Sequence, residues 1–132
     1  MILVTCAIIE KEGMILAAQR SATMSHPLKW EFPGGKIEEG ESEEDCLHRE
    51  ILEELNLEIE IVQRLTPVEQ HYAEKSIRLI PFRCRLRGGN LILHEHLAVE
   101  WELPERIHRL DFSGADVKVL EVYREYLERG QD

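Results

Sequence analysis

Three glutamates near the middle of the chain have the residue type and the spacing needed to bind a metal ion. Glu50, Glu53 and Glu54 stand at positions i, i+3 and i+4, so on a helix their carboxylates would share one face. Like charges at these spacings repel one another by roughly a few tenths of a kcal/mol, and a bound divalent cation would reverse that penalty. An ordinary solvated acidic face is the alternative, and these three residues alone do not exclude it.

The acidic charge of the protein is concentrated around these glutamates. The chain has 26 acidic and 16 basic residues and a formal net charge of −10. Nine acids and one base, Arg49, lie between Glu38 and Glu54, so this segment carries −8, while the remaining 17 acids and 15 bases carry −2. Such a surface repels nucleic-acid backbones and attracts hard cations, which prefer oxygen ligands. We therefore expect no nucleic-acid polymer as a partner, and we expect a polyphosphate to bind only together with its metal.

The segment that carries the glutamates is predicted to form one helix, residues 42–55. Ser42 with Asp45 matches a capping box, and acidic residues crowd the first turn, where the helix dipole favours them. Another face of this helix is apolar, at Leu47, Ile51 and Leu55. The helix should therefore bury one side and present its carboxylates on a second, and Asn56 should end it as a left-handed cap.

The rest of the chain has the patterns of a sheet with one further helix. Strands are predicted at residues 2–9, 14–18, 57–61, 80–86 and 97–101, with turns at Lys11-Glu12-Gly13 and Gly88-Gly89-Asn90. Residues 20–41 are predicted to be mostly loop, and residues 116–129 an amphipathic closing helix. These elements predict one α/β domain over residues 1–132, with a mixed sheet and helices packed on it.

The apolar runs and the cysteines indicate where the protein resides. The longest apolar run, Ile2 to Ile9, is too short to span a bilayer, and no basic residues precede it as in a signal peptide. Cys6, Cys46 and Cys84 are odd in number and form no CxxC pair, so we expect reduced, buried thiols. We therefore expect a cytoplasmic protein with no membrane partner. The sequence does not distinguish a monomer from a homodimer.

The residues around the predicted glutamate helix resemble the Nudix box, a loop–helix–loop signature. From Gly35 the chain has five residues, Glu41, seven residues and then Arg49-Glu50-Ile51-Leu52-Glu53-Glu54-Leu55-Asn56-Leu57. All spacings of the signature are met. The one departure is Asn56, where the family usually has glycine. Asparagine is the next-best residue for a left-handed backbone, so we expect the turn to be preserved.

The resemblance extends to the MutT subgroup of the family and covers nearly the whole chain. It is carried by Trp30-Glu31-Phe32-Pro33-Gly34-Gly35-Lys36, by Gln19-Arg20, and by the stretches 95–101 and 110–116. The subgroup members that it resembles are 8-oxo-dGTP diphosphatases and CTP pyrophosphohydrolases. The resemblance implies the Nudix fold, an α/β/α sandwich. It also implies Mg²⁺-dependent hydrolysis of a nucleoside triphosphate to a monophosphate and pyrophosphate, which sanitises the nucleotide pool and so contributes to DNA repair.

By this resemblance, the metal is bound by helix carboxylates and by a backbone carbonyl of the preceding loop. The implied ligands are Glu50, Glu53, Glu54 and Gly34 or Gly35. The expected ion is Mg²⁺, with Mn²⁺ as the alternative. The implied catalytic residues are Glu50, Glu53 and Glu100. Either Glu50 or Glu100 would accept the proton of the attacking water, and the sequence leaves this choice open. An exposed strand residue is the other interpretation of Glu100.

The resemblance also implies which residues contact the substrate and which support the metal ligands. The implied substrate contacts are Arg20, Glu31, Phe32, Pro33, Gly34 and Asp116. Arg20 would bind phosphate through its planar fork, with an ordinary surface arginine as the alternative. Arg49 and Glu41 would orient the metal ligands rather than touch substrate. Asp116 stands where members selective for 8-oxoguanine have Asn and CTP-preferring members have Asp. It would therefore accept hydrogen bonds from a base, unless it is merely a helix cap.

The sequence is also compatible with two other functions, and it contains a histidine pair and an arginine cluster outside the glutamate helix. Another Nudix substrate, such as a dinucleoside polyphosphate or a nucleotide sugar, is one alternative. A non-catalytic nucleotide sensor on the same fold is the second, and such a protein would be expected to lack box glutamates that this chain retains. His94 and His96 are predicted to be surface residues rather than a metal pair. Arg83, Arg85 and Arg87 are predicted to form a solvated face of the sheet.

Overall fold

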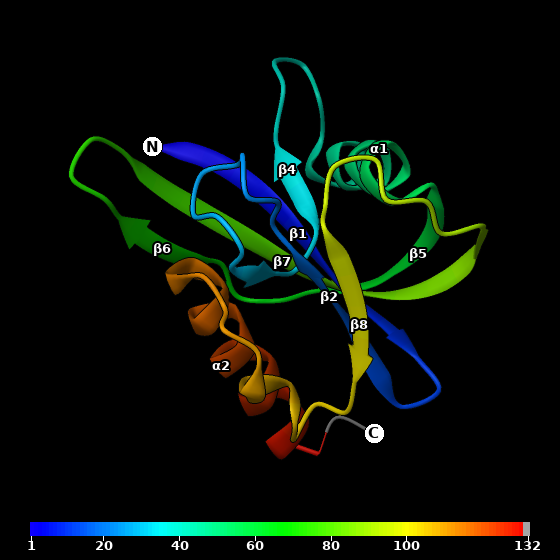
Figure 1. The fold of residues 1–132 in the computed structure, drawn as a ribbon. Coiled ribbons are helices and arrows are strands. Elements are labelled where there is room, and N and C mark those ends of the chain that lie inside the picture. The colour runs from blue at the N-terminus through cyan, green and yellow to red at the C-terminus, as the bar shows by residue number, and fades with distance from the viewer. Residues whose placement is uncertain (131–132) are drawn as a thin grey trace.

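The computed structural model describes residues 1–130, in which eight strands form one mixed sheet with a helix on each face (Figure 1). The strands are β1 (Ile2–Lys11), β2 (Met14–Gln19), β3 (Trp30–Glu31), β4 (Gly34–Lys36), β5 (Leu57–Arg64), β6 (Val68–His71), β7 (Ser76–Gly89) and β8 (Ala98–Glu102). The helices are α1 (Glu43–Leu55), a short 3-10 turn η1 (Ile107–Arg109) and α2 (Gly114–Glu128). The strand order is β3-β2-β1-β7-β5, with β4 paired to β1, β6 to β7 and β8 to β2.

The centre of the sheet is the parallel pair β1 and β7, which stay in register from Ile2 beside Ile77 to Glu10 beside Arg85. Side chains alternate across these strands, so each face carries its own core. One face packs against α1 and the other against α2, which Figure 1 shows on opposite sides of the sheet. The predicted α/β/α sandwich with a mixed sheet is therefore confirmed.

Helix α1 begins and ends as the sequence predicts. The Ser42 side chain accepts a hydrogen bond from the Asp45 backbone N–H at 3.0 Å. Asn56 has a left-handed backbone, with φ 58° and ψ 35°, and its Nδ2 donates to the carbonyl of Asn90 at 2.9 Å. Leu47, Ile51 and Leu55 are fully buried on the sheet. The carboxylate-bearing face is thereby held in a fixed orientation.

The structure corrects four details of the predicted elements. Three short strands, β3, β4 and β6, were not predicted, because each has only two to four residues and is defined by its pairing with a longer strand. The predicted turn at Gly88 and Gly89 is wrong, since both residues extend β7 and pair with the start of β5. Helix α2 begins two residues earlier than predicted, with Ser113 as its N-cap. Arg83 is not solvated, because its guanidinium pairs with Glu10 at 2.9 Å and donates to the Tyr126 hydroxyl.

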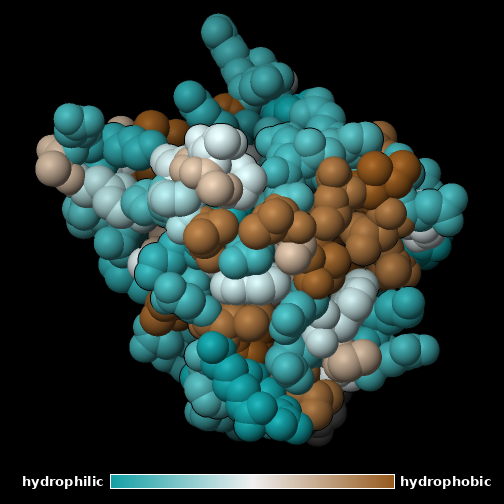
Figure 2. Space-filling model, in the orientation of Figure 1, coloured by the Kyte–Doolittle hydropathy of each residue, from teal (hydrophilic) through white to brown (hydrophobic). Residues whose placement is uncertain are grey.

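The loop before β8 rests on the end of α1. Backbone N–H groups of Ile92 and His94 donate to the carbonyls of Leu55 and Glu54, at 3.0 and 3.1 Å. Its leucines and isoleucine face outward, and Figure 2 shows apolar side chains gathered on this side of the molecule. The loop is thus anchored by backbone contacts to the helix that carries the glutamates.

Cys6, Cys46 and Cys84 are free and buried, as predicted. Within residues 1–130, no helix is long and apolar enough to span a membrane.

The left-handed cap at Asn56 leads to a prediction about stability. Asn56→Gly should be tolerated or slightly stabilising, because glycine adopts this backbone without strain. Asn56→Val should destabilise the protein by more than about 1 kcal/mol, because a β-branched side chain opposes a positive φ. Chemical denaturation of the three proteins measures both effects. Equal free energies of unfolding would show that the cap does not contribute.

Candidate active site

A cavity of about 290 Å³ runs from the start of α2 to the C-terminal part of α1. Its walls include β1 and β7, through Val4, Thr5, Ile77 and Leu79. Among the residues implied by resemblance, it brings together Arg20, Glu31, Phe32, Gly34, Gly35, Glu54 and Asp116. Pro33 is buried but does not line the cavity, and neither do Glu41, Arg49, Glu50, Glu53 and Glu100. The cavity therefore has a carboxylate at each end, Glu54 at one and Asp116 at the other.

Glu54 and Glu50 form a desolvated carboxylate pair. Glu54 is only 6% exposed, and its Oε1 is buried with no hydrogen-bond partner among the described residues. Burial raises the pKa of Glu54 to about 10, and the charges of Glu31 and Glu50 add to this rise. Burial also raises the pKa of Glu50, although the Glu54 and Arg49 side chains oppose it. Glu54 is therefore protonated at neutral pH unless a cation replaces its proton.

Two glycines allow the loop before α1 to approach the carboxylates closely. A Cβ atom on Gly35 would lie 2.2 Å from the carboxyl carbon of Glu50, and one on Gly34 would lie 2.0 Å from the Thr5 carbonyl oxygen. The Thr5 hydroxyl donates to the Gly35 carbonyl at 3.2 Å, which ties this loop to β1. A side chain at Gly34 would overlap the backbone of β1, and one at Gly35 would displace the Glu50 carboxylate, so backbone atoms lie directly beside that carboxylate.

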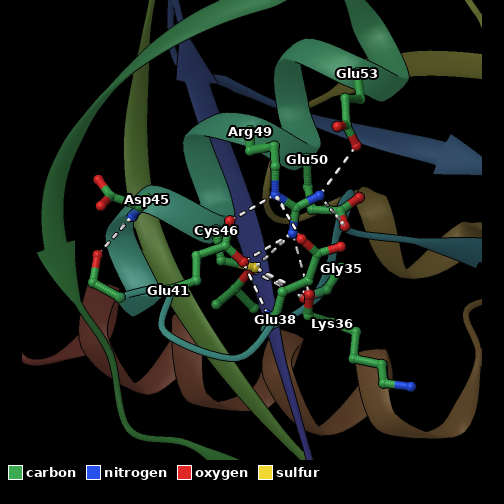
Figure 3. Close-up of polar contacts among 11 residues, drawn as sticks. Gly35, Lys36, Glu38, Glu41, Asp45, Cys46, Arg49, Glu50 and Glu53 are labelled. Atoms are coloured by element: carbon green, nitrogen blue, oxygen red, sulfur yellow. Dashed lines mark hydrogen bonds and ion pairs between the residues drawn. The ribbon is translucent and has the colours of Figure 1, made fainter.

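Arg49 binds three glutamates and so organises this side of α1 (Figure 3). Its Nε and Nη2 donate to the two carboxylate oxygens of Glu41, at 2.6 and 2.9 Å. Its Nη1 donates to Glu50 and to Glu53, at 3.1 Å each. The hydrogen bonds from Arg49 lower the pKa of Glu41 to about 2, and a backbone bond from Glu38 adds to this effect. Arg49 therefore fixes the Glu50 and Glu53 side chains and is itself held by Glu41.

The oxygen donors of α1 fit a divalent cation. Within residues 1–130, no three His, Cys, Asp or Glu side chains already converge as a formed metal site. Among the described residues, Glu54 nevertheless offers a buried oxygen with no partner, with Glu50 beside it. Glu53 is half-exposed and is held by Arg49. These are hard donors of the kind that Mg²⁺ and Mn²⁺ prefer. A cation would supply the partner that Glu54 lacks.

Glu100 lies apart from these carboxylates. It is exposed on β8 opposite Ala17, whose side chain belongs to the core beneath α2. The adjacent Val99 and Trp101 pack on the α1 side, so Glu100 faces the other side of the sheet. Glu95, in the loop before β8, has a charge that contributes to the raised pKa of Glu54. The sequence did not identify Glu95 as a site residue, because its position depends on how this loop folds back on α1.

The Glu31 carboxylate is held between the side chains of Arg20 and His96. Its Oε1 accepts from Nη1 of Arg20 at 2.7 Å, and its Oε2 lies 2.8 Å from Nε2 of His96. His96 is 5% exposed, so its predicted position on the surface is wrong, whereas His94 is exposed as predicted. His96 and Glu31 are 65 positions apart along the chain, and no local sequence pattern indicates that they meet.

Asp116 lies at the other end of the cavity and is 5% exposed. Its Oδ1 accepts from the backbone N–H of Phe32 at 2.9 Å, and its Oδ2 accepts from the Ser113 hydroxyl at 2.6 Å. Burial raises its pKa to about 7, and the charge of Glu31 adds to the rise. Ser113, not Asp116, occupies the N-cap position of α2, so Asp116 is not that helix's N-cap.

The fold and this carboxylate-bearing helix are those of a Nudix hydrolase. A match to the NUDIX domain spans residues 2–123, and the chain therefore belongs to the Nudix family. Members of this family act on small nucleotides and generally use divalent metal ions. The predicted family is confirmed, and so is the prediction that the protein is an enzyme.

Individual relatives indicate which subgroup of the Nudix family the chain resembles. The chain is 37% identical to the CTP pyrophosphohydrolase of Escherichia coli K12, over 93% of this chain and 91% of that protein. It is 32% identical to a putative 8-oxo-dGTP diphosphatase 2 of Mycobacterium tuberculosis, over 86% and 82%. The solution structure of the Escherichia coli ORF135 protein superposes with a TM-score of 0.87 and 34% identity, covering 99% of this chain and 94% of that one. The MutT subgroup resemblance is thereby confirmed.

The contacts of Arg49 lead to a prediction about turnover. Arg49→Lys keeps the charge but cannot bind Glu41 through two parallel N–H groups while also holding Glu50 and Glu53. We expect kcat to fall by about 10- to 100-fold, as when a residue that orients metal ligands is replaced. Steady-state kinetics measures this, with Arg64→Lys as the control, because Arg64 pairs with Glu43 away from the cavity. Equal activity of the two variants would contradict the role assigned to Arg49.

Proposed function

We propose that this protein is a Mg²⁺-dependent pyrophosphohydrolase that converts a nucleoside triphosphate to a monophosphate and pyrophosphate. The observation that carries the proposal is the buried Glu54 carboxylate, with a partnerless oxygen, at one end of a cavity whose other end presents Asp116. A cation would supply a partner for the first group, and the second would accept hydrogen bonds from a base. The three free, buried thiols support a reducing cytoplasm as its location.

The residues of α1 would bind the cation and accept a proton. Glu50, Glu53 and Glu54, with a carbonyl of Gly34 or Gly35, would hold Mg²⁺, with Mn²⁺ as a substitute. Bound Mg²⁺ would neutralise phosphate oxygens and favour attack by water. Of the two candidate bases we favour Glu50 over Glu100. Burial raises the pKa of Glu50, which makes its carboxylate a stronger base, whereas Glu100 is exposed on the opposite face of the sheet.

The rest of the cavity would bind the nucleotide. Arg20 lines it and would contact a phosphate. The ring of Phe32, packed 5.2 Å from that of Phe112, forms part of its apolar wall. Asp116 would accept hydrogen bonds from the amine of cytosine or from N1–H and N2–H of a guanine. The named activities of the relatives support cytosine nucleotides and 8-oxo-dGTP as the substrates, and so a role in sanitising the nucleotide pool.

The proposed metal ligands lead to a prediction about turnover. Glu53→Gln and Glu54→Gln should each lower kcat by at least ~100-fold, since a metal ligand contributes several kcal/mol to transition-state stabilisation. Folding should be retained, because Glu53→Gln removes a like charge and Glu54→Gln replaces a protonated carboxyl by an uncharged amide of similar size. Pyrophosphate release with Mg²⁺, across a panel of nucleotides, measures the effect. Glu44→Gln, on the same helix but outside the cavity, should leave turnover unchanged. Near wild-type turnover of the double variant would refute the assignment.

The raised pKa of Glu54 gives the same assignment a pH signature. The unfolded value is about 4.3, and the value in the metal-free folded protein is about 10. The stability that this proton contributes is fully present below pH ~4 and is lost as pH rises through about 10. Because Mg²⁺ must displace the proton, its apparent affinity should increase with pH between ~6 and ~9. Calorimetry in buffers of different ionisation enthalpy should detect proton release in the wild type and not in Glu54→Gln.

Asp116 leads to a prediction about base selection. Above pH ~8, where Asp116 is ionised, cytosine nucleotides and 8-oxo-dGTP should exceed UTP and dTTP in kcat/KM, because uracil and thymine present carbonyl oxygens to a carboxylate that only accepts. Asp116→Asn should shift the preference toward 8-oxo-dGTP by ~1–3 kcal/mol, the size of one good base contact. If the variant instead loses activity on every nucleotide by the same factor, Asp116 is structural.

A further inference from the structure

A row of three side chains links the buried histidine before β8 to the wall of the nucleotide cavity. Nε2 of His96 lies 2.8 Å from Glu31, and Glu31 lies 2.7 Å from Nη1 of Arg20. The three residues come from the loop before β8, from β3 and from the end of β2. We propose that His96 is a positioning residue for nucleotide binding, which acts through Glu31 to hold Arg20 in place for a substrate phosphate. The inference rests on the proposed function, because the ligand of Arg20 is taken to be the triphosphate.

Burying His96 costs free energy, which the hydrogen bond to Glu31 offsets. Its side chain is 1% exposed. A carboxylate only accepts, so Nε2 carries the hydrogen that is donated to Glu31. Nδ1 is then left buried, and it has no partner among the described residues. An unsatisfied buried nitrogen costs free energy that an apolar side chain of similar size would avoid. The contribution that offsets this cost is the hydrogen bond to Glu31.

The Arg20 guanidinium is held by Ser25 and by Glu31, and two of its N–H groups remain available to a ligand. Its Nε and Nη2 donate to the backbone and hydroxyl oxygens of Ser25, and its Nη1 donates to Glu31. A guanidinium has five N–H groups, so one remains on each Nη. The side chain is 17% exposed and lines the cavity. The two remaining N–H groups lie in the guanidinium plane and can donate to phosphate oxygens, and fixing that plane beforehand lowers the entropy lost on binding.

Glu31 needs both partners because other carboxylates lie near it. Its charge contributes to the raised pKa of Glu54 and of Asp116, at the two ends of the cavity. A Glu31 side chain that lost His96 would keep one partner only and would be free to turn. Arg20 would then lose the contact that fixes its plane. The position of His96 therefore determines the geometry of a residue that it does not touch.

The test compares two replacements of His96 with a neighbouring control. His96→Phe keeps the ring volume but removes the donor, and His96→Gln restores an N–H group at similar reach. His96→Phe should raise KM for the best nucleoside triphosphate by ~10-fold and change kcat by less than ~3-fold, because only binding geometry is lost. His96→Gln should recover most of this loss. His94→Phe, in the same loop but exposed, should behave as wild type.

A double-mutant cycle determines whether His96 acts through Arg20. In an Arg20→Ala background, His96→Phe should raise KM no further. Additive effects on KM, or a change confined to kcat or to the melting temperature, would overturn the proposal. If His96→Phe does not fold, His96→Asn replaces it, because its shorter amide does not reach Glu31.

Binding of inorganic pyrophosphate with Mg²⁺, followed by calorimetry, separates this inference from the proposed function. His96→Phe should weaken that binding by ~10-fold, whether or not any triphosphate is cleaved. A wild-type protein that hydrolyses no triphosphate in the panel would refute the proposed function alone. Unchanged pyrophosphate affinity in His96→Phe would refute the positioning role alone.

Discussion

The carboxylates of Glu50 and Glu54 are held next to each other out of water, and the free energy that this arrangement costs must come from the rest of the fold. Burial raises the pKa of both carboxyl groups, and the charge of Glu50 raises the pKa of Glu54 further. Helix α1 offsets the cost by burying its apolar face completely, and Arg49 contributes a cation that contacts Glu50 directly. The site is thus a desolvated pair of carboxyl groups, which packing and one arginine hold in place.

The sheet supplies the frame that makes this arrangement possible. The long parallel pairing of β1 with β7 places Thr5 beneath the glycine loop, and the same strands provide the apolar wall of the cavity. The loop before β8 then returns over the end of α1 and delivers His96 to Glu31. The Glu54 end and the Asp116 end of the cavity are therefore attached to one rigid sheet.

Local patterns predicted α1 well, because its caps, its apolar face and its carboxylates are all set by residues within one turn of each other. The left-handed Asn56 is such a case. Contacts between distant segments could not be predicted in this way. The predictions that His96 lies on the surface and that the two glycines at the end of β7 form a turn are both wrong. In each case the observed conformation depends on a partner far away in the chain, Glu31 for His96 and the start of β5 for the glycines. The placement of Glu100 away from the helix carboxylates has the same origin.

The close approach at Gly34 and Gly35 has a consequence for how such a site can evolve. The loop lies against β1 and Glu50 through backbone atoms, with no side chain between them. Exchanging one apolar core residue for another alters the packing on either face of the sheet but leaves this backbone contact as it is. The core can therefore accumulate substitutions over long divergence while the spacing between strand, loop and carboxylate stays constant. The absence of side chains at Gly34 and Gly35 therefore contributes to the geometry of the site as the glutamates do.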